Sequence, residues 1–166
     1  MAGTGNQMTN YLNKLNNIFH GIIAVPLIVF AFLFLELDSG GFEPVFGGRY
    51  YYMESGILFL LSLIFIVWLF SWFKKQVTVI AASEENLKVR LERYKEISIR
   101  FYLLMTSPGA LAIILMFLTG EVSFSLIYIL ELFLLSLKRP SVLNISNNLN
   151  LKAEEREIVM KKKELK

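Results

Sequence analysis

The chain has 166 residues, of which 55% are hydrophobic and 14% aromatic, and its formal net charge is +3. A composition this apolar excludes an ordinary soluble domain and is typical of a small protein with several membrane spans. The absence of cysteine excludes a disulfide framework and a cysteine nucleophile, and a single histidine excludes a histidine cluster.

The first helical pattern begins near Met8. Apolar residues recur there at helical spacing, and asparagines lie largely on the other side, so we expect an amphipathic helix on the membrane surface. This helix continues into a first apolar span over residues 18–35, in which Pro26 removes one backbone donor. Because no small-residue cleavage site follows the run, we predict a retained span rather than a signal peptide.

The second apolar run, residues 56–73, is the clearest membrane-spanning segment of the sequence. It carries no charge, and as a helix it would rise about 27 Å, close to the roughly 30 Å of a bilayer's hydrocarbon core. Tyrosines 50–52 precede it and Trp68 and Trp72 lie near its end, as expected at the two membrane interfaces. The 36–55 segment before it contains two glycine pairs and Pro44, which predict a loop.

A charged segment over residues 76–100 predicts a helix that runs directly into a third span. Ser83 is the predicted N-cap, and the acidic residues that follow it suit the first turn of a helix. The third span covers residues 101–119. It contains the triplet Ser107, Pro108 and Gly109, at which we expect the helix to be interrupted.

The fourth apolar run, residues 122–137, follows a tight turn and is short for a membrane span. If it were re-entrant instead, the remaining chain would lie on the outer side of the membrane. That remaining chain, residues 141–166, is a polar tail, with an asparagine-rich stretch followed by a charged helix from about Leu151 to Leu165.

The positions of the lysines and arginines predict the orientation. Lys14 precedes the first span, seven basic residues lie within 74–100 and eight lie from Lys138 onward, whereas Arg49 is alone in the 36–55 loop. Positively charged segments remain on the cytoplasmic side, so both termini and the 76–100 segment should be cytoplasmic. We therefore predict an all-α polytopic membrane protein in the plasma (bacterial inner) membrane. Its residues 1–140 would form four transmembrane helices in two hairpins, N-in and C-in, followed by the cytoplasmic tail 141–166.

Glu131 is the first candidate for a functional site, because it lies within the fourth apolar run. An ionised carboxylate at that depth is costly unless it is paired or faces water. One interpretation is an ion or proton site. The other is a protonated or hydrogen-bonded glutamate that holds the fourth helix to a neighbour, with Tyr102, Ser107 or His20 as partner.

Two further features carry weaker hypotheses of the same kind. His20 could join a proton path with Glu131, or it could be an interfacial histidine bonded to a backbone carbonyl. The break at Ser107, Pro108 and Gly109 could offer backbone carbonyls to a substrate or ion, or it could only bend the helix.

The outer loop is the last candidate for a binding site. Glu36, Asp38, Glu43 and Glu54 could bind Ca²⁺, but they lack the regular spacing of a calcium loop. We favour a solvated acidic loop in which Arg49 pairs with one of these carboxylates.

The motifs of common enzymes are missing from the sequence, which has no phosphate-binding glycine loop, no G-x-S-x-G and no H-E-x-x-H. We therefore predict no catalytic residue, no cofactor and no metal. The basic stretches KVRLERYK and KKKELK could attract anionic lipids, but their interleaved acids favour a solvated helix face or a protein contact. Nucleic-acid binding is not expected.

Two function hypotheses remain, and both place the chain in the lipid bilayer with other membrane subunits or copies of itself as partners. The first is a non-catalytic accessory or structural subunit of a larger inner-membrane complex. The second is an ion- or proton-coupled transport element that works through Glu131 as a homo-oligomer. A sensor or a membrane-disrupting effector is a third, less favoured hypothesis.

Overall fold

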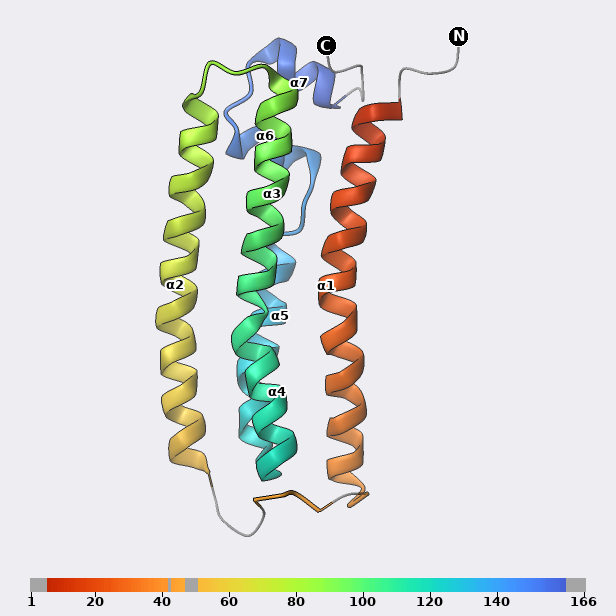
Figure 1. The fold of residues 1–166 in the computed structure, drawn as a ribbon, viewed down its shortest axis with the longest axis vertical. Coiled ribbons are helices and arrows are strands. Elements are labelled where there is room, and N and C mark those ends of the chain that lie inside the picture. Colours follow the sequence, from red (N-terminus) through yellow and green to blue (C-terminus); the bar gives the residue numbers. More distant parts are fainter. Residues whose placement is uncertain (1–5, 42, 47–50, 161–166) are drawn as a thin grey trace. The chain divides into compact units, whose positions relative to one another are not determined.

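The computed structural model describes residues 6–41, 43–46 and 51–160, and every regular element in this part of the chain is a helix, with no strand (Figure 1). The elements in chain order are α1 (Asn6–Asp38), α2 (Tyr52–Ala82), α3 (Leu87–Met105), α4 (Ser107–Thr119), the 3₁₀ turn η1 (Val122–Phe124), α5 (Ser125–Leu137), α6 (Val142–Asn148) and α7 (Ala153–Met160). The predicted all-α class is confirmed.

Three helical stretches are long and apolar enough to cross a membrane. They are Asn10–Asp38, Tyr52–Ala82 and Leu87–Thr119, the last of which comprises α3 and α4. Val122–Leu137 is a shorter apolar helix. At about 1.5 Å per residue, a helix of 33 residues such as α1 measures about 50 Å and is longer than the roughly 30 Å hydrocarbon core. The three long helices are those of a membrane protein, while the four-span topology and its orientation stay predictions.

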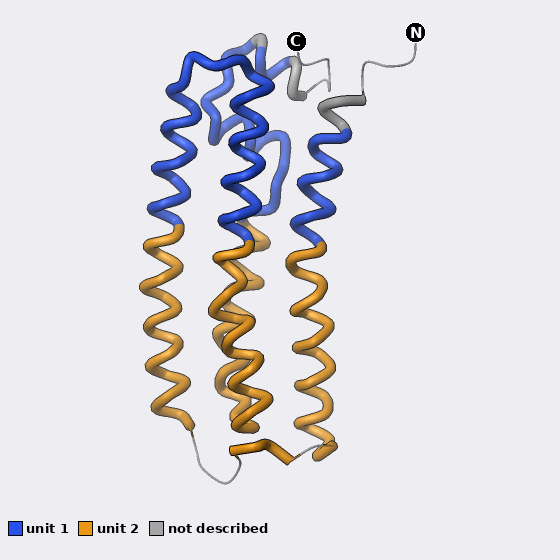
Figure 2. The backbone as a smooth tube through the Cα atoms, in the orientation of Figure 1, with its two compact units in different colours: residues 1–20, 70–102, 138–166 blue, residues 21–69, 103–137 orange. Residues whose placement is uncertain are grey.

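The chain forms two compact units, which Figure 2 colours separately. Unit 1 consists of residues 1–20, 70–102 and 138–166, and unit 2 consists of residues 21–69 and 103–137. The segments rich in lysine and arginine all belong to unit 1, whereas the most apolar segments make up unit 2.

The core of unit 2 lies along the hairpin of α4 and α5. Ala112 and Met116 of α4, Phe124 of η1 and Ile127 of α5 are buried together. Partly buried residues of α1, α2 and α4 and one residue just before α2 pack against this cluster: Phe30, Leu33, Leu37, Tyr51, Leu58, Phe59 and Leu115. Every helix of unit 2 therefore contributes to one core.

The described part of the 36–55 loop is packed against the turn that ends α4. The Phe46 N–H donates to the Leu118 carbonyl over 2.9 Å. Gly120 ends α4 with a φ of 73°, a left-handed conformation that favours glycine, and its N–H donates to Met116 O. A side chain at Gly120 would also collide with the ring of Pro44. The turn and the loop thus constrain each other.

Arg90 of α3 is the centre of unit 1. Its side chain is 8% exposed, and its guanidinium donates to Glu155 Oε1 of α7 over 3.0 Å and to the Leu149 carbonyl at the end of α6 over 2.8 Å. The tail is therefore more than a polar extension, because Ile145 and Leu149 are buried against the rest of the unit. Two further hydrogen bonds lie in unit 1: Tyr11 OH of α1 donates to Leu91 O of α3, and Asn148 Nδ2 of α6 donates to Tyr94 OH of α3.

The predicted N-cap at Ser83 is wrong. Helix α2 continues through Val77 and Ile80, which are buried, and ends only at Ala82. Ser83 donates through its hydroxyl to Ile80 O over 2.8 Å, so it closes the end of α2. Asn86 takes the capping role, since its side-chain oxygen accepts from the Lys88 N–H and its carbonyl accepts from the Arg90 N–H.

The tail also differs in detail from the prediction. The asparagine-rich stretch forms the short helix α6, capped by Ser141, whose side chain accepts from the Asn144 N–H. The charged helix predicted from Leu151 to Leu165 is α7, Ala153–Met160, and the rest of that predicted range lies outside the described residues.

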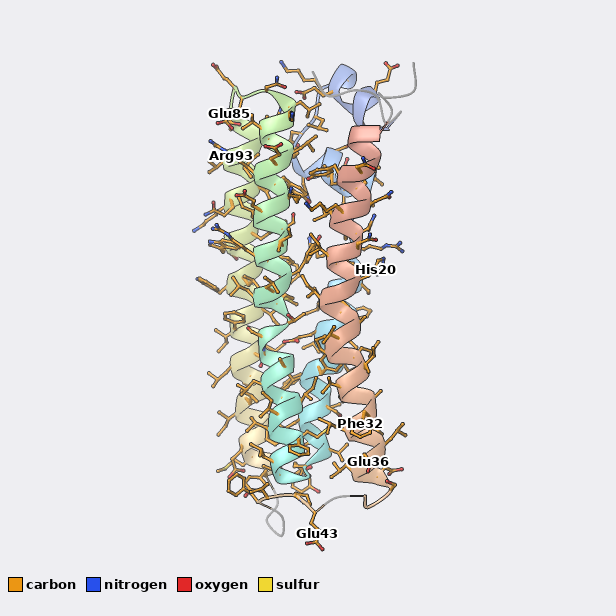
Figure 3. All side chains as sticks on the ribbon, turned by 45° about the vertical axis from the view of Figure 1, so that its right-hand side comes forward. His20, Phe32, Glu36, Glu43, Glu85 and Arg93 are labelled. Carbon is orange, nitrogen blue, oxygen red and sulfur yellow. The ribbon has the colours of Figure 1, made fainter. Side chains whose placement is uncertain are left out.

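Replacing Arg90 by Met should release the tail from unit 1. Hydrogen bonds to a charged group contribute roughly 1.5–3 kcal/mol each, so the free energy of local opening over residues 142–160 should fall by about 2 kcal/mol. Hydrogen exchange in detergent would show faster exchange in α6 and α7. Arg93→Met is the matched control, because Arg93 is exposed and pairs with Glu85 across 2.7 Å (Figure 3). Equal exchange in the two variants would contradict the anchoring role.

Candidate functional site

The interruption between α3 and α4 lies at Thr106, next to the predicted triplet. Pro108 has no N–H, so the carbonyl of Leu104, four residues earlier, loses its usual helical donor. The Ser107 hydroxyl donates to that carbonyl over 2.8 Å, and the Thr106 hydroxyl donates to Leu103 O over 3.0 Å. These carbonyls are therefore satisfied within the chain, which weakens the hypothesis that the break offers them to a substrate.

The same break leaves a backbone N–H at the start of α4 without a helical acceptor, and Glu131 of α5 accepts its hydrogen bond. The Gly109 N–H donates to Glu131 Oε1 over 2.7 Å, and the helical ladder resumes with the bond from Ala110 N–H to Thr106 O. A carboxylate at the first turn of a helix also interacts favourably with the helix dipole. Glu131 is 0% exposed. It therefore acts as an N-terminal cap supplied to α4 by the neighbouring helix.

Gly109 is suited to this site because it lacks a side chain. A Cβ atom there would collide with Glu131 Oε2 and would lie 2.9 Å from Cδ2 of Tyr128. Tyr128 and Glu131 are three residues apart on α5 and so lie on one face of that helix. The face of α5 that carries the carboxylate can approach the α4 backbone only at a glycine.

Two buried polar atoms of the site have no hydrogen-bond partner among the described residues. They are Oε2 of Glu131 and the hydroxyl of Tyr128. A buried polar atom without a partner is costly, and in a bilayer the cost is higher still. The second carboxylate oxygen is therefore the part of the site at which a proton or a cation could be held.

An open groove of about 330 Å³ lies beside the break. It is lined by Leu58, Leu61, Ser62 and Phe65 of α2 and by Ser107, Pro108 and Leu111 of α4. Its two serines are engaged with the backbone, since Ser62 donates to Leu58 O and Ser107 to Leu104 O. The groove suits an apolar chain better than a polar substrate.

The structure brings the glutamate and the helix break together. The partner of Glu131 is the backbone N–H of Gly109, two residues after Ser107, which was one of the predicted partners. His20 lies on α1 in unit 1, with an exposed side chain whose ring meets that of Phe19 edge-on at 5.6 Å (Figure 3). A proton path between His20 and Glu131 stays a prediction.

Two residues matter in ways that the sequence analysis missed. The role of Gly109 was signalled by a glycine directly after a proline within an apolar span, which indicates close backbone approach. Arg90 was counted among the solvated charges. Its place beside Leu87, Leu91 and Tyr94 on the buried side of α3 was the available signal.

In the part of the acidic outer loop that the structure describes, no group of three acidic or histidine side chains converges. Glu43 is exposed on the loop (Figure 3). Arg49, the predicted pairing partner, lies outside the described residues.

Comparison with known proteins adds no further assignment. No protein-family model matches the chain, and searches of curated proteins and of solved structures find no significant match.

Replacing Gly109 by Ala should destabilise unit 2. The new methyl group overlaps the carboxylate of Glu131, and overpacking of this kind costs roughly 1–3 kcal/mol. Unfolding in detergent, followed by tryptophan fluorescence, would measure the loss. Gly56→Ala is the matched control, since a Cβ at Gly56 meets nothing within 4 Å and should leave stability equal or slightly higher. If both variants unfolded alike, the close approach of α5 to Gly109 would be wrong.

Proposed function

We propose that the chain is a non-catalytic structural subunit of a larger complex in the plasma (bacterial inner) membrane. The observation that carries the proposal is the bond between Glu131 and Gly109. The one acidic residue within the fourth apolar run caps a helix break and fastens α5 to α4, which is a structural task. A buried glutamate used in this way needs no transported ion to explain it.

The surface of α1 in unit 2 supports a subunit role. Only 6% of the apolar 18-residue stretch of this helix is buried within the chain. Val25, Ile28, Phe32 and Leu35 follow one another at helical spacing and are 61–68% exposed (Figure 3 labels Phe32). In a bilayer such a stripe is covered by lipid or by the helix of another subunit, and the proposal assigns a partner helix to part of it.

The contacts within unit 1 support four spans with both termini on the cytoplasmic side. Arg90 and Tyr11 join the three segments that carry most of the positive charge. Segments that pack together lie on one side of a membrane, and the positive charge favours the cytoplasmic side.

A hydrogen bond at the ends of the α4–α5 hairpin argues against a tail on the outer side. Tyr102 OH donates to Lys138 O over 3.1 Å, so the chain returns to unit 1 beside the point where it left. The segment η1 plus α5 measures about 26 Å, which is close to the thickness of the hydrocarbon core.

A second candidate function rests on one specific observation. Oε2 of Glu131 and the Tyr128 hydroxyl are buried without a hydrogen-bond partner among the described residues. A proton or ion exchanged at this oxygen would make the chain a transport element. It would work as a homo-oligomer, because the few helices of one chain enclose little space for a transport path. We rank it second because the groove beside the break is mostly apolar.

The topology can be tested cleanly because the chain contains no cysteine. Ser39→Cys should react with a membrane-impermeant maleimide in intact cells, because the 36–55 loop faces outward. Ala82→Cys and Lys152→Cys should react only after permeabilisation, and the unmodified chain is the blank. Labelling of Lys152→Cys from outside would place the tail there and contradict the four-span arrangement.

Glu131→Gln and Glu131→Leu separate the two functions. Gln keeps an oxygen for the Gly109 N–H but cannot exchange a proton, whereas Leu removes the acceptor and should cost about 2 kcal/mol. If the chain is a structural subunit, the Glu131→Gln variant should be extracted in mild detergent with the same partners, at the same stoichiometry, as the unmodified protein. The Glu131→Leu variant should lose these partners. Native mass spectrometry would measure both.

Glu121→Gln is the control for this pair, because Glu121 also accepts a backbone N–H, from Ser123, but at a turn. A pure homo-oligomer whose proton or ion flux in liposomes is abolished by Glu131→Gln, and not by Glu121→Gln, would overturn the structural proposal in favour of transport.

A further inference from the structure

A pocket of about 510 Å³ in unit 1 lies apart from the Glu131 site. One wall is a face of α2 that includes Phe70, Lys74 and Val77 at helical spacing. The other wall is formed by Lys138 and by the asparagines at the end of α6, among them Asn147 and Asn150.

The pocket contains several hydrogen-bond donors, two of them cationic. Lys74 and Lys138 bring two ammonium groups, and none of the described residues that line the pocket is acidic. Nζ of Lys138 lies 5.2 Å from the centre of the Phe70 ring, a contact that holds the ammonium over the apolar floor. Asn147 and Asn150 are exposed and add amide donors, and Asn150 adopts a left-handed backbone with a φ of 47°. This combination suits a phosphate group.

The two lysines stand where apolar runs end. Lys74 directly follows the run 56–73, and Lys138 directly follows Leu137, the last residue of the run 122–137. In a chain that spans the bilayer as proposed above, both positions are at the level of the lipid headgroups. Phe70 lies within its run, so the pocket has an apolar side towards the membrane core and a cationic side towards water.

We propose that this pocket binds the phosphate-bearing headgroup of an anionic phospholipid. The phosphate would accept from Lys74 and Lys138, and the glycerol region would rest on the Phe70 side. The stretches KVRLERYK and KKKELK carry interleaved acids and differ from this pocket in that respect. A soluble phosphate ester shares the same chemistry, but the position at the ends of two apolar runs favours a lipid. The inference rests on the membrane embedding proposed above.

The test uses the full-length protein in nanodiscs that contain phosphatidylcholine with a minor fraction of phosphatidylglycerol, and native mass spectrometry counts the retained lipids. The unmodified protein should retain phosphatidylglycerol in preference to phosphatidylcholine. Lys74→Gln combined with Lys138→Gln should weaken this retention about 30-fold. Each lysine that donates a hydrogen bond to the bound phosphate contributes about 1 kcal/mol, and 1.4 kcal/mol is a ten-fold change.

The matched control is Lys75→Gln combined with Arg139→Gln. It removes the same two charges at neighbouring exposed positions that do not line the pocket, and it should change retention less than about three-fold. If both double variants lost phosphatidylglycerol retention equally, surface charge alone would explain the effect and the proposed site would be wrong.

A variant that fills the pocket without changing the charge gives an independent test. Asn147→Phe should also abolish the preference for phosphatidylglycerol, and unchanged retention would overturn the pocket as the site. If soluble glycerol phosphate bound with the same dependence on Lys74 and Lys138 while no anionic lipid was retained, the lipid assignment would be wrong. Membrane fractionation of every variant separates a failure of the embedding, which would remove the protein from the membrane, from a failure of the site alone.

Discussion

The hydrogen bond from the Gly109 N–H to the Glu131 carboxylate is the constraint on which the rest of unit 2 depends. A proline in an apolar helix leaves backbone groups without partners, and in a bilayer no water is present to replace them. Hydroxyls on the same helix satisfy the carbonyls, and the neighbouring helix supplies a carboxylate for the amide. The register of α5 against α4 is thereby set, since the carboxylate fits only opposite a residue without a side chain. The core around Ala112 and Ile127 follows from that register.

In unit 1, Arg90 has a role similar to that of Glu131 in unit 2, because it is a buried charged side chain that joins separate segments. Arg90 is buried, yet its donors reach a carboxylate of α7 and the carbonyl of Leu149, which follows α6. A charge that would otherwise be costly thereby organises three segments of the chain. The guanidinium suits this task because its planar fork reaches several acceptors at once. The tail is thus a packed part of the unit, and its residues Asn147, Asn148 and Asn150 line the pocket that contains Lys74 and Lys138. Unit 1 therefore offers a fixed arrangement of donors beside the ends of two apolar runs.

The two proposals address different parts of the molecule and stand on different physics. The proposal of a structural role rests on Glu131, one oxygen of which accepts a hydrogen bond from the Gly109 N–H. The lipid site draws on lysines whose charge is unopposed by any acid among the described lining residues. A structural subunit with a headgroup site at the membrane surface is consistent with both. The unpartnered Oε2 is the feature that keeps transport as the competing function.

Local sequence alone determined the helical class, the three long apolar helices and the interruption near Pro108. The helices follow from hydropathy, and the interruption follows from the missing N–H of proline. Local patterns failed at Ser83, since burial of Val77 and Ile80 extended α2 beyond the point that the capping residue indicated. The sequence offered Ser107 of the helix break, besides Tyr102 and His20, as a partner of Glu131, but it did not single out the backbone of Gly109. Only the tertiary structure decided that Gly109 meets Glu131 and that Arg90 is buried against the tail. Such pairings join residues 22 and 65 positions apart in the chain, and they depend on the packing register between helices, which no local pattern encodes.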